Sequence, residues 1–93
     1  SSAASDVYKR QGCQLVGIEL LENAEYLPSF RHPRLAAYIL GSERYGLSKN
    51  ILQRCDKIIK VPTKFSLNLA LTGGIVLYDR LISMKNFYKR PIM

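Results

Sequence analysis

The sequence predicts an α/β domain with a mainly parallel sheet and flanking helices. Two observations lead to this fold class. Short apolar runs that suit buried strands alternate with segments of helical period, and each of the last two runs is followed by a polar turn and a capped helix. This alternation is typical of parallel sheets, in which ligands bind beyond the carboxyl ends of the strands. With 93 residues, the chain is at most one small domain.

The first half of the chain contains two predicted strands separated by a loop. Residues 13–21 are mostly apolar and include β-branched side chains, which favours a buried strand. Pro28 and Pro33 then mark a loop. Residues 35–40 form a second apolar run, stopped by Gly41. An unbroken run of this kind is typical of a parallel strand covered on both faces.

The second half contains a short helix, a third strand and a long helix. Ser48 is a good N-cap for a short helix that ends near Asp56, and residues 57–61 form the third strand. Ser66 is predicted to cap the long helix. One row of that helix is entirely apolar and consists of Leu67, Leu71, Ile75, Tyr78 and Ile82.

Little of the long helix is therefore expected to face water. The row is expected to lie mostly in the core, and its apolar excess to mark a dimer interface. Gly73 and Gly74 lie inside this helix, where each Gly costs about 1 kcal/mol relative to Ala. Close approach of another backbone is a reasonable explanation for the pair.

The charge is uneven along the chain. Residues 1–30 contain two Lys or Arg against four Asp or Glu, whereas residues 31–93 contain twelve against three. A polyanion fits this basic part as a partner, and ordinary solvated lysines fit it equally well. Cys13 and Cys55 have no metal-binding or redox spacing, so buried free thiols in a reducing cytosol and no metal site are expected. Residues 65–78 are uncharged but too short for a membrane span, which takes about 20 residues.

Two strand-to-helix turns carry the candidate site. Residues 41–48 hold glycines that let backbone groups approach a ligand, with the carboxylate of Glu43 beside them. Residues 61–68 place Ser66 and Asn68 at a helix entrance, where exposed amides can bind an anion. Each turn alone also fits a simpler explanation, namely a tight turn for the glycines and a helix cap for Ser66.

Taken together, the two turns resemble the conserved motifs of the SpoU family, RNA ribose 2′-O-methyltransferases of the SPOUT class that include the TrmH type. LGSERYGLS is similar to the second motif of that family, and VPTKFSLNLALTGGIVLYDRL to the third. The resemblance covers residues 35–82. It implies an α/β fold with a C-terminal trefoil knot, a homodimer, a cytoplasmic location, S-adenosylmethionine as cofactor, and tRNA or rRNA as substrate.

The resemblance also implies roles for individual residues. Four positions match the cofactor-binding groups of the family: Gly41, Gly46, Val61 and Leu67. Three match its polar residues near the reacting centre: Glu43, Ser66 and Asn68. Two basic side chains beside these motifs are expected to contact RNA: Arg44 and Lys64.

The sequence departs from the family pattern at two places. Only Thr63-Lys64-Phe65 separates Pro62 from Ser66, where family members commonly have a longer stretch. The first family motif, Asn-x-Gly followed by an Arg that helps to activate the 2′-hydroxyl, belongs upstream of Cys13, and Arg10 follows no Asn-x-Gly. Residues 1–93 are therefore expected to be the C-terminal portion of a methyltransferase domain that is inactive alone. Within it, residues 1–12 have no clear period and are expected to be poorly ordered, or the remnant of a truncated N-terminal half.

The remaining conspicuous residues have open interpretations. His32 is predicted to be a surface or RNA-facing residue, and Tyr45 either stacks on a base or ribose or packs on its own scaffold. Five basic residues form either a phosphate-binding rim or solvated element ends: Lys49, Arg54, Lys57, Lys60 and Lys64. The tail residues Tyr88, Lys89 and Arg90 either touch RNA or fray.

A rival function from another class is a non-catalytic RNA-binding module. In that case the basic surface binds RNA and the two loops are only turns. A generic nucleotide-binding domain would be expected to contain a Gly-rich phosphate loop, and the sequence contains neither G-x-G-x-x-G nor G-x-x-x-x-G-K-[ST].

Overall fold

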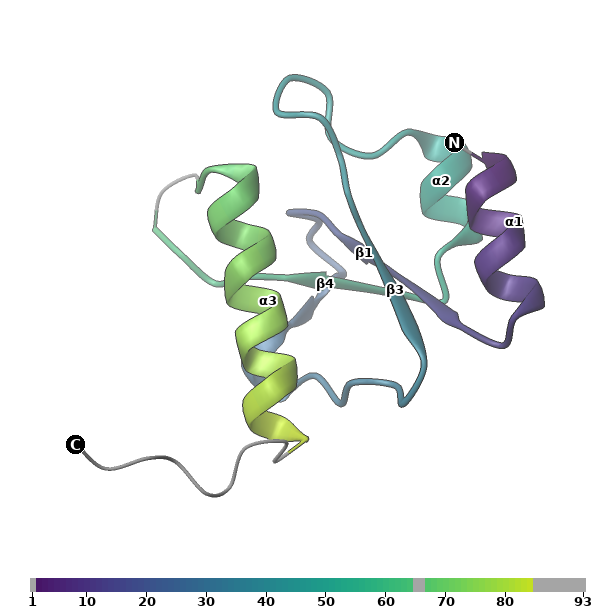
Figure 1. Ribbon diagram of the computed structural model, residues 1–93. Helices are drawn as coiled ribbons and strands as arrows, with labels where there is room; N and C mark the ends of the chain where they lie inside the picture. Colours follow the sequence, from purple (N-terminus) through teal and green to yellow (C-terminus); the bar gives the residue numbers. More distant parts are fainter. Residues whose placement is uncertain (1, 65–66, 85–93) are drawn as a thin grey trace.

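The structure, a computed structural model, describes residues 2–64 and 67–84. Its elements follow one another in this order: α1 (Ser2–Arg10), β1 (Gln14–Ile18), β2 (Glu25–Tyr26), the short 3-10 helix η1 (Leu27–Ser29), β3 (Ala36–Leu40), α2 (Lys49–Arg54), β4 (Lys57–Lys60) and α3 (Leu69–Ser83). The three main predicted strands and the two predicted helices are all present. Figure 1 shows the helices arranged around one central sheet.

The sheet is parallel throughout, which confirms the predicted fold class. Its strand order is β2-β4-β1-β3, with residues 14–18 of β1 opposite residues 36–40 of β3. On its other side β1 pairs with β4, and β4 pairs with β2. The sequence did not predict β2, because two residues are too short to show an alternating pattern.

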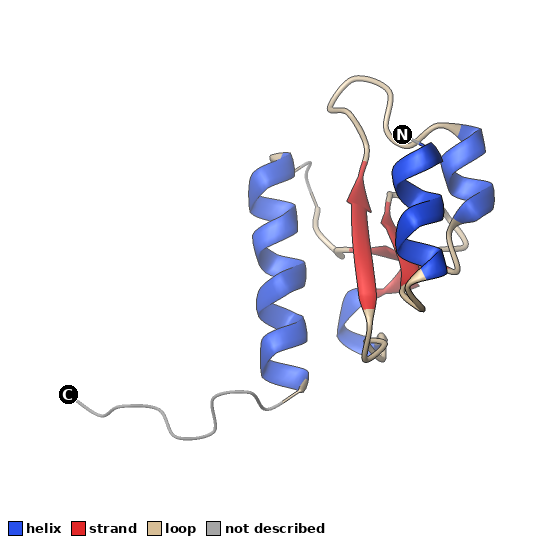
Figure 2. Cartoon of the chain, turned by 45° about the vertical axis from the view of Figure 1, so that its right-hand side comes forward, coloured by secondary structure: helices blue, strands red, loops and turns tan. Residues whose placement is uncertain are grey.

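The core lies between the sheet and α3. Val16, Ile59 and Val76 are fully buried, and Ile18, Leu27 and Phe30 complete the cluster. In Figure 2, α3 covers one face of the sheet, while α1 and α2 lie on the other. The domain therefore has three layers, as flanking helices on a parallel sheet require.

β3 is an edge strand, and the prediction that both of its faces are covered was wrong. All five of its residues are only half-buried, because one edge has no neighbouring strand among the described residues. An open pocket also separates β3 from Tyr8 and Ile51, so α1 and α2 do not close over its face. The apolar run identified the strand but not its position in the sheet.

Residues 2–10 form α1, although no regular structure was expected there. Ion pairs hold this helix against the rest of the domain: Arg54 Nη1 lies 2.6 Å from Asp6 Oδ1, and Lys9 Nζ lies 3.7 Å from Asp56 Oδ1. Lys9 and Arg10 also occupy the last turn, where cations favour the helix dipole. Partners distant in sequence stabilise α1, so its own periodicity could not reveal it.

α3 begins later than predicted and is more exposed. Asn68 is its N-cap and accepts hydrogen bonds from the amides of Ala70 and Leu71. The expected cap, Ser66, lies outside the described residues. Of the predicted apolar row, Leu71, Tyr78 and Ile82 are about half exposed, so the expectation that little of the helix faces water was wrong for this chain.

Among the described residues, the two glycines of α3 do not meet another backbone. A Cβ at Gly73 would make ordinary contact with the side chain of Leu40, and a Cβ at Gly74 would point into open space. Val76 and Ile75 pack against the core, so the predicted row is divided: Ile75 faces the sheet, whereas Leu71, Tyr78 and Ile82 are exposed. The helical period identified the row, but only the packing shows that no other part of residues 2–64 and 67–84 covers Leu71, Tyr78 and Ile82.

His32 is buried, and the prediction of a surface or RNA-facing residue was wrong. Its Nδ1 lies 2.7 Å from Tyr38 Oη, and its Nε2 lies 2.7 Å from Asp79 Oδ2 of α3. Next to His32 and Asp79, Arg80 donates to the carbonyls of Pro33 and Arg34 and to the Tyr38 hydroxyl. This network ties α3 to the segment before β3, so His32 has a structural role.

Cys13 and Cys55 are free thiols, but each is half-buried instead of fully buried. Within residues 2–64 and 67–84, no helix combines the length and the apolar character that crossing a bilayer requires. The knot implied by the resemblance stays a prediction, since residues 85–93 of the C-terminal segment lie outside the described part of the chain.

Candidate functional site

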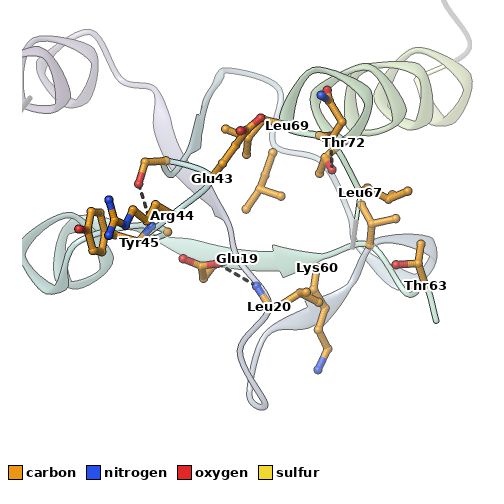
Figure 3. A pocket seen from close by; sticks show the side chains of 15 residues that line it. Glu19, Leu20, Glu43, Arg44, Tyr45, Lys60, Thr63, Leu67, Leu69 and Thr72 are labelled. Atoms are coloured by element: carbon orange, nitrogen blue, oxygen red, sulfur yellow. Dashed lines mark hydrogen bonds between the residues drawn. The ribbon is translucent and has the colours of Figure 1, made fainter. Parts of the chain in front are cut away.

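A pocket opens at the carboxyl ends of the central strands, where a parallel sheet is expected to bind ligands. Its volume is about 700 Å³. Residues after β1, β3 and β4 and the first turn of α3 line it, as Figure 3 shows: Ile18, Glu19, Leu20, Ser42, Glu43, Arg44, Tyr45, Gly46, Lys60, Val61, Thr63, Leu67, Asn68, Leu69 and Thr72. The two predicted turns thus meet at one pocket.

The first turn is a tight hairpin. Gly46 donates its amide to the Ser42 carbonyl at 2.9 Å, and the Ser42 amide donates back to the Gly46 carbonyl at 3.3 Å. The Ser42 hydroxyl accepts the amide of Tyr45 at 3.0 Å. The simpler explanation, a tight turn, is therefore correct as a description of residues 42–46, and the turn also forms one wall of the pocket.

Two glycines make this hairpin possible for different reasons. A Cβ at Gly41 would overlap the carbonyl carbon of Gly46 and the amide nitrogen of Leu47, so only Gly allows the chain to cross itself there. Gly46 has a φ of 68°, in the left-handed region that favours Gly. A Cβ at Gly46 would also overlap the carboxylate of Glu19. Gly46 lines the pocket, whereas Gly41 lies beneath the turn, outside the lining.

Glu19 holds the hairpin in place, although the sequence did not predict this role. Its Oε2 accepts the amide of Leu47 at 2.6 Å, and its Oε1 accepts the amide of Leu20 at 3.2 Å. Leu47 is only 8% exposed, so its amide is shielded from water. The available signal was an acidic residue immediately after a buried strand, at the edge where the pocket forms.

The second turn brings Val61, Leu67 and Asn68 to the opposite wall of the pocket. The Asn68 carboxamide oxygen accepts two amides of the first helical turn, at 2.8 and 3.2 Å. Asn68 therefore reaches the predicted site while it caps α3. Ser66, predicted beside it, lies outside the described residues.

The predicted basic rim does not form a single surface around the pocket. Arg54 and Lys57 lie at the amino end of β4, whereas the pocket lies at its carboxyl end. Lys60 lines the pocket, but its ammonium group donates to the carbonyls of Leu21 and Glu22 and lies 4.6 Å from the ring centroid of Tyr26. Lys49 and Lys64 are exposed and lie outside the lining.

The tip of the hairpin carries an acidic, a basic and an aromatic side chain, all of which line the pocket. Glu43, Arg44 and Tyr45 are exposed, and the Arg44 guanidinium lies 5.3 Å from the centroid of the Tyr45 ring. In the described part of the chain, no group of three or more His, Cys, Asp or Glu side chains is arranged to hold a metal ion. The tail residues Tyr88, Lys89 and Arg90 lie outside the described residues.

Comparison with known proteins agrees with this fold. The model of the SpoU rRNA Methylase family matches residues 1–78, so the chain belongs to that family. The chain is 29% identical over 89 residues to a tRNA (guanosine(18)-2′-O)-methyltransferase of Aquifex aeolicus, covering 90% of this chain and 42% of that protein. It is 27% identical over 74 residues to the mouse tRNA (guanosine(18)-2′-O)-methyltransferase TARBP1, covering 76% of this chain and 5% of that protein.

Solved structures show the same fold. The TrmH/SpoU tRNA modifying enzyme of A. aeolicus aligns with a TM-score of 0.78 and 27% identity, over 99% of this chain and 49% of that one. The SpoU methyltransferase AviRb of Streptomyces viridochromogenes, solved with AdoMet, aligns with a TM-score of 0.75 and 22% identity, over 90% of this chain and 36% of that one. The chain thus spans less than half the length of these relatives.

Proposed function

We propose that this chain supplies the cofactor-binding part of an enzyme that transfers a methyl group from S-adenosylmethionine to a ribose 2′-hydroxyl of tRNA or rRNA. The observation that carries the proposal is the meeting of two family-like turns at one pocket. Its volume of about 700 Å³ suits a cofactor of this size, since small-molecule sites span about 300–1,000 Å³. Two relatives are tRNA 2′-O-methyltransferases, and one structural neighbour was solved with AdoMet.

The pocket residues suit this cofactor in their chemistry. Gly46, Val61 and Leu67 line the pocket from two loops, and we assign their main-chain groups to cofactor binding. Gly41 contributes indirectly, because the absence of a Cβ there lets the first loop cross close to the backbone of Gly46 and Leu47. When bound, the cofactor supplies an electrophilic methyl group on a sulfonium.

The polar residues at the pocket are assigned to the substrate. The Glu43 carboxylate orients the ribose hydroxyl, and Asn68 acts across the pocket from it at the entrance of α3. Ser66, which matches the polar pair of the family motif, has the same assignment by that resemblance alone. Positioning of the hydroxyl and removal of its proton dominate such a transfer. Arg44 and Lys64 contact RNA. We assign no residue of this chain to the hydroxyl-activating Arg of the family, so the tests use the whole protein that contains this chain.

We also propose a homodimer. Exposed apolar side chains gather on one face of α3, namely Leu71, Leu77, Tyr78, Leu81 and Ile82. Gly74 lies among them, and a Cβ there would meet open space, so a second copy could bring its backbone close at this point. Leu77→Glu is expected to convert the dimer to monomers in sedimentation experiments. Gln53→Glu, which adds the same charge to the exposed face of α2, is expected to leave it intact. A cytoplasmic location is also part of the proposal, because free thiols are typical of proteins in a reducing compartment.

Methyl transfer from labelled S-adenosylmethionine to bulk tRNA and rRNA tests the function directly. Alkaline hydrolysis of the product identifies the position, because a 2′-O-methyl group blocks cleavage of the adjacent phosphodiester. Glu43→Gln should lower the rate by roughly 100-fold, the cost of misplacing a reacting group by about 1 Å. Glu22→Gln is the matched control on an exposed loop. RNA binding without any calorimetric affinity for S-adenosylmethionine would favour a non-catalytic RNA-binding module instead.

A further inference from the structure

Tyr45 places a solvent-exposed aromatic ring at the rim of the pocket. Its side chain is 77% exposed, more than any other large apolar or aromatic side chain in the described part of the chain. The Arg44 guanidinium lies over the ring, 5.3 Å from its centroid. Since a ring has two faces and Tyr45 is so exposed, the face away from Arg44 is open to a ligand. Tyr45 therefore does not pack on its own scaffold.

The loop that carries Tyr45 is held firmly. Hydrogen bonds in both directions join Ser42 and Gly46, and the Ser42 hydroxyl accepts the amide of Tyr45 itself. From below, the Glu19 carboxylate accepts the amide of Leu47. A Tyr side chain on a fixed backbone loses little conformational entropy when a ligand stacks on it.

The charges at the loop tip favour a flat, neutral ligand over a free phosphate. Glu43 and Arg44 are adjacent in sequence and carry opposite charges, so together they add no net charge to the tip of the hairpin. The open ring face is the remaining binding feature. Nucleobases stack on such faces regardless of sequence, and proteins that read unpaired RNA use aromatic and guanidinium planes in this way.

The position of Tyr45 connects the ring to the reacting centre. Tyr45, Arg44 and Glu43 are consecutive and all line the same pocket, and Figure 3 shows Arg44 and Tyr45 together at one side of it. A base stacked on Tyr45 would hold its own ribose, or that of the adjacent nucleotide, at the mouth of the pocket. We infer that Tyr45 is the stacking platform for an unpaired nucleobase of the RNA substrate, at or next to the nucleotide that is modified. This inference rests on the proposed function and adds a positioning residue to it.

Fluorescence of a base analogue provides the test. The whole protein, without cofactor, is titrated with a short single-stranded oligouridine that contains one central 2-aminopurine, whose emission falls when it stacks on an aromatic ring. Tyr45→Ala should abolish this quenching and weaken binding about 5- to 150-fold, the range for one base stacked on an aromatic side chain. Tyr45→Trp and Tyr45→Phe should retain both properties, whereas Tyr45→Leu, apolar but not aromatic, should lose them.

Two controls separate stacking from a change of fold. A fully abasic oligonucleotide of the same length, which has no base to stack, should bind wild type and Tyr45→Ala equally, because the interaction needs both the base and the ring. Tyr26→Ala is the matched protein control, since Tyr26 is exposed and, like Tyr45, lies beside a cation, here Lys60, but is outside the pocket lining. Equal losses in Tyr26→Ala and Tyr45→Ala, or full binding by Tyr45→Leu, would overturn the inference.

Failure of the inference is distinguishable from failure of the proposed function. Affinity for S-adenosylmethionine, measured by calorimetry, should be the same in wild type and Tyr45→Ala, while the KM for RNA rises in the variant. If no variant binds the cofactor or methylates RNA, the proposed function fails, yet the fluorescence result still decides whether Tyr45 stacks on a base. If methylation proceeds and Tyr45→Ala changes neither the KM nor the quenching, the stacking role alone is refuted.

Discussion

Removal of the Glu19 carboxylate should loosen the hairpin that carries the pocket. The carboxylate accepts the Leu47 amide at 2.6 Å and the Leu20 amide at 3.2 Å. Leu47 is 8% exposed, so in Glu19→Ala its amide loses a charged acceptor where water hardly reaches. A buried donor left without a partner costs about 1–3 kcal/mol, and we expect the free energy of unfolding to fall by that amount.

A graded series sharpens this prediction. Glu19→Gln keeps an acceptor oxygen but removes the charge, and neutral hydrogen bonds contribute roughly half as much as charged ones, so a loss of about 1 kcal/mol is expected. Glu22→Ala is the matched control, because Glu22 is exposed in the loop that follows β1. Exposed substitutions of this kind usually stay within about 0.5 kcal/mol of wild type.

Urea denaturation of the whole protein measures these differences as shifts of the midpoint at constant slope. Hydrogen exchange of the Leu47 amide provides a local readout, and its exchange should accelerate in Glu19→Ala more than in Glu19→Gln. The reasoning would be refuted if Glu19→Ala and Glu22→Ala had the same stability, or if exchange at Leu47 were unchanged in both Glu19 variants.

Three further predictions follow from the packing. Gly41→Ala should destabilise the protein by about 1–3 kcal/mol or more and abolish cofactor binding, because the new Cβ overlaps backbone atoms of the hairpin. Gly73→Ala is the control, since its Cβ makes only ordinary contacts. Equal stability of the two variants in urea would contradict the prediction. Asp79→Ala should lower the free energy of unfolding in urea by about 1–3 kcal/mol, since the buried His32 loses its 2.7 Å partner, and an unchanged midpoint would count against the network. Burial, and after it the Asp56 carboxylate, raise the pKa of the Cys55 thiol above its ordinary value. Folding therefore favours the neutral thiol, and alkylation of Cys55, followed by peptide mass spectrometry, should be slower at pH 7 in the folded protein than in urea. A rate at pH 7 equal to that in urea would disprove this.

Much of the fold could be predicted because its signals are local. Apolar runs flanked by glycine and proline identified β1, β3 and β4, and Ser48 correctly identified the start of α2. A side-chain period or a cap depends on residues a few positions apart, so it can be read along the chain. The same holds for the two turns, because the glycines and polar residues that shape each turn lie within it.

Other features depended on partners distant in sequence. α1 is held by Asp6 and Lys9 against residues more than forty positions away, and His32 is buried by contact with Asp79 of α3. Glu19 likewise acts on Leu47, 28 positions later in the chain. No local pattern distinguishes these paired side chains from solvated charges or a surface histidine, because the packing of distant segments determines which partners they meet.

The sequence by itself determined the fold class and the two turns that form the pocket, because both follow from short-range periods and from the backbone freedom of glycine. Only the tertiary structure decided how these turns are used. It placed them at one edge of the parallel sheet and fixed the first with the Glu19 carboxylate. It also left the Tyr45 ring exposed at the rim of the pocket, and one face of α3 uncovered by the other described residues. The physical reason is that burial and hydrogen-bond partners are properties of the packed chain, and they appear only when segments far apart in sequence come into contact.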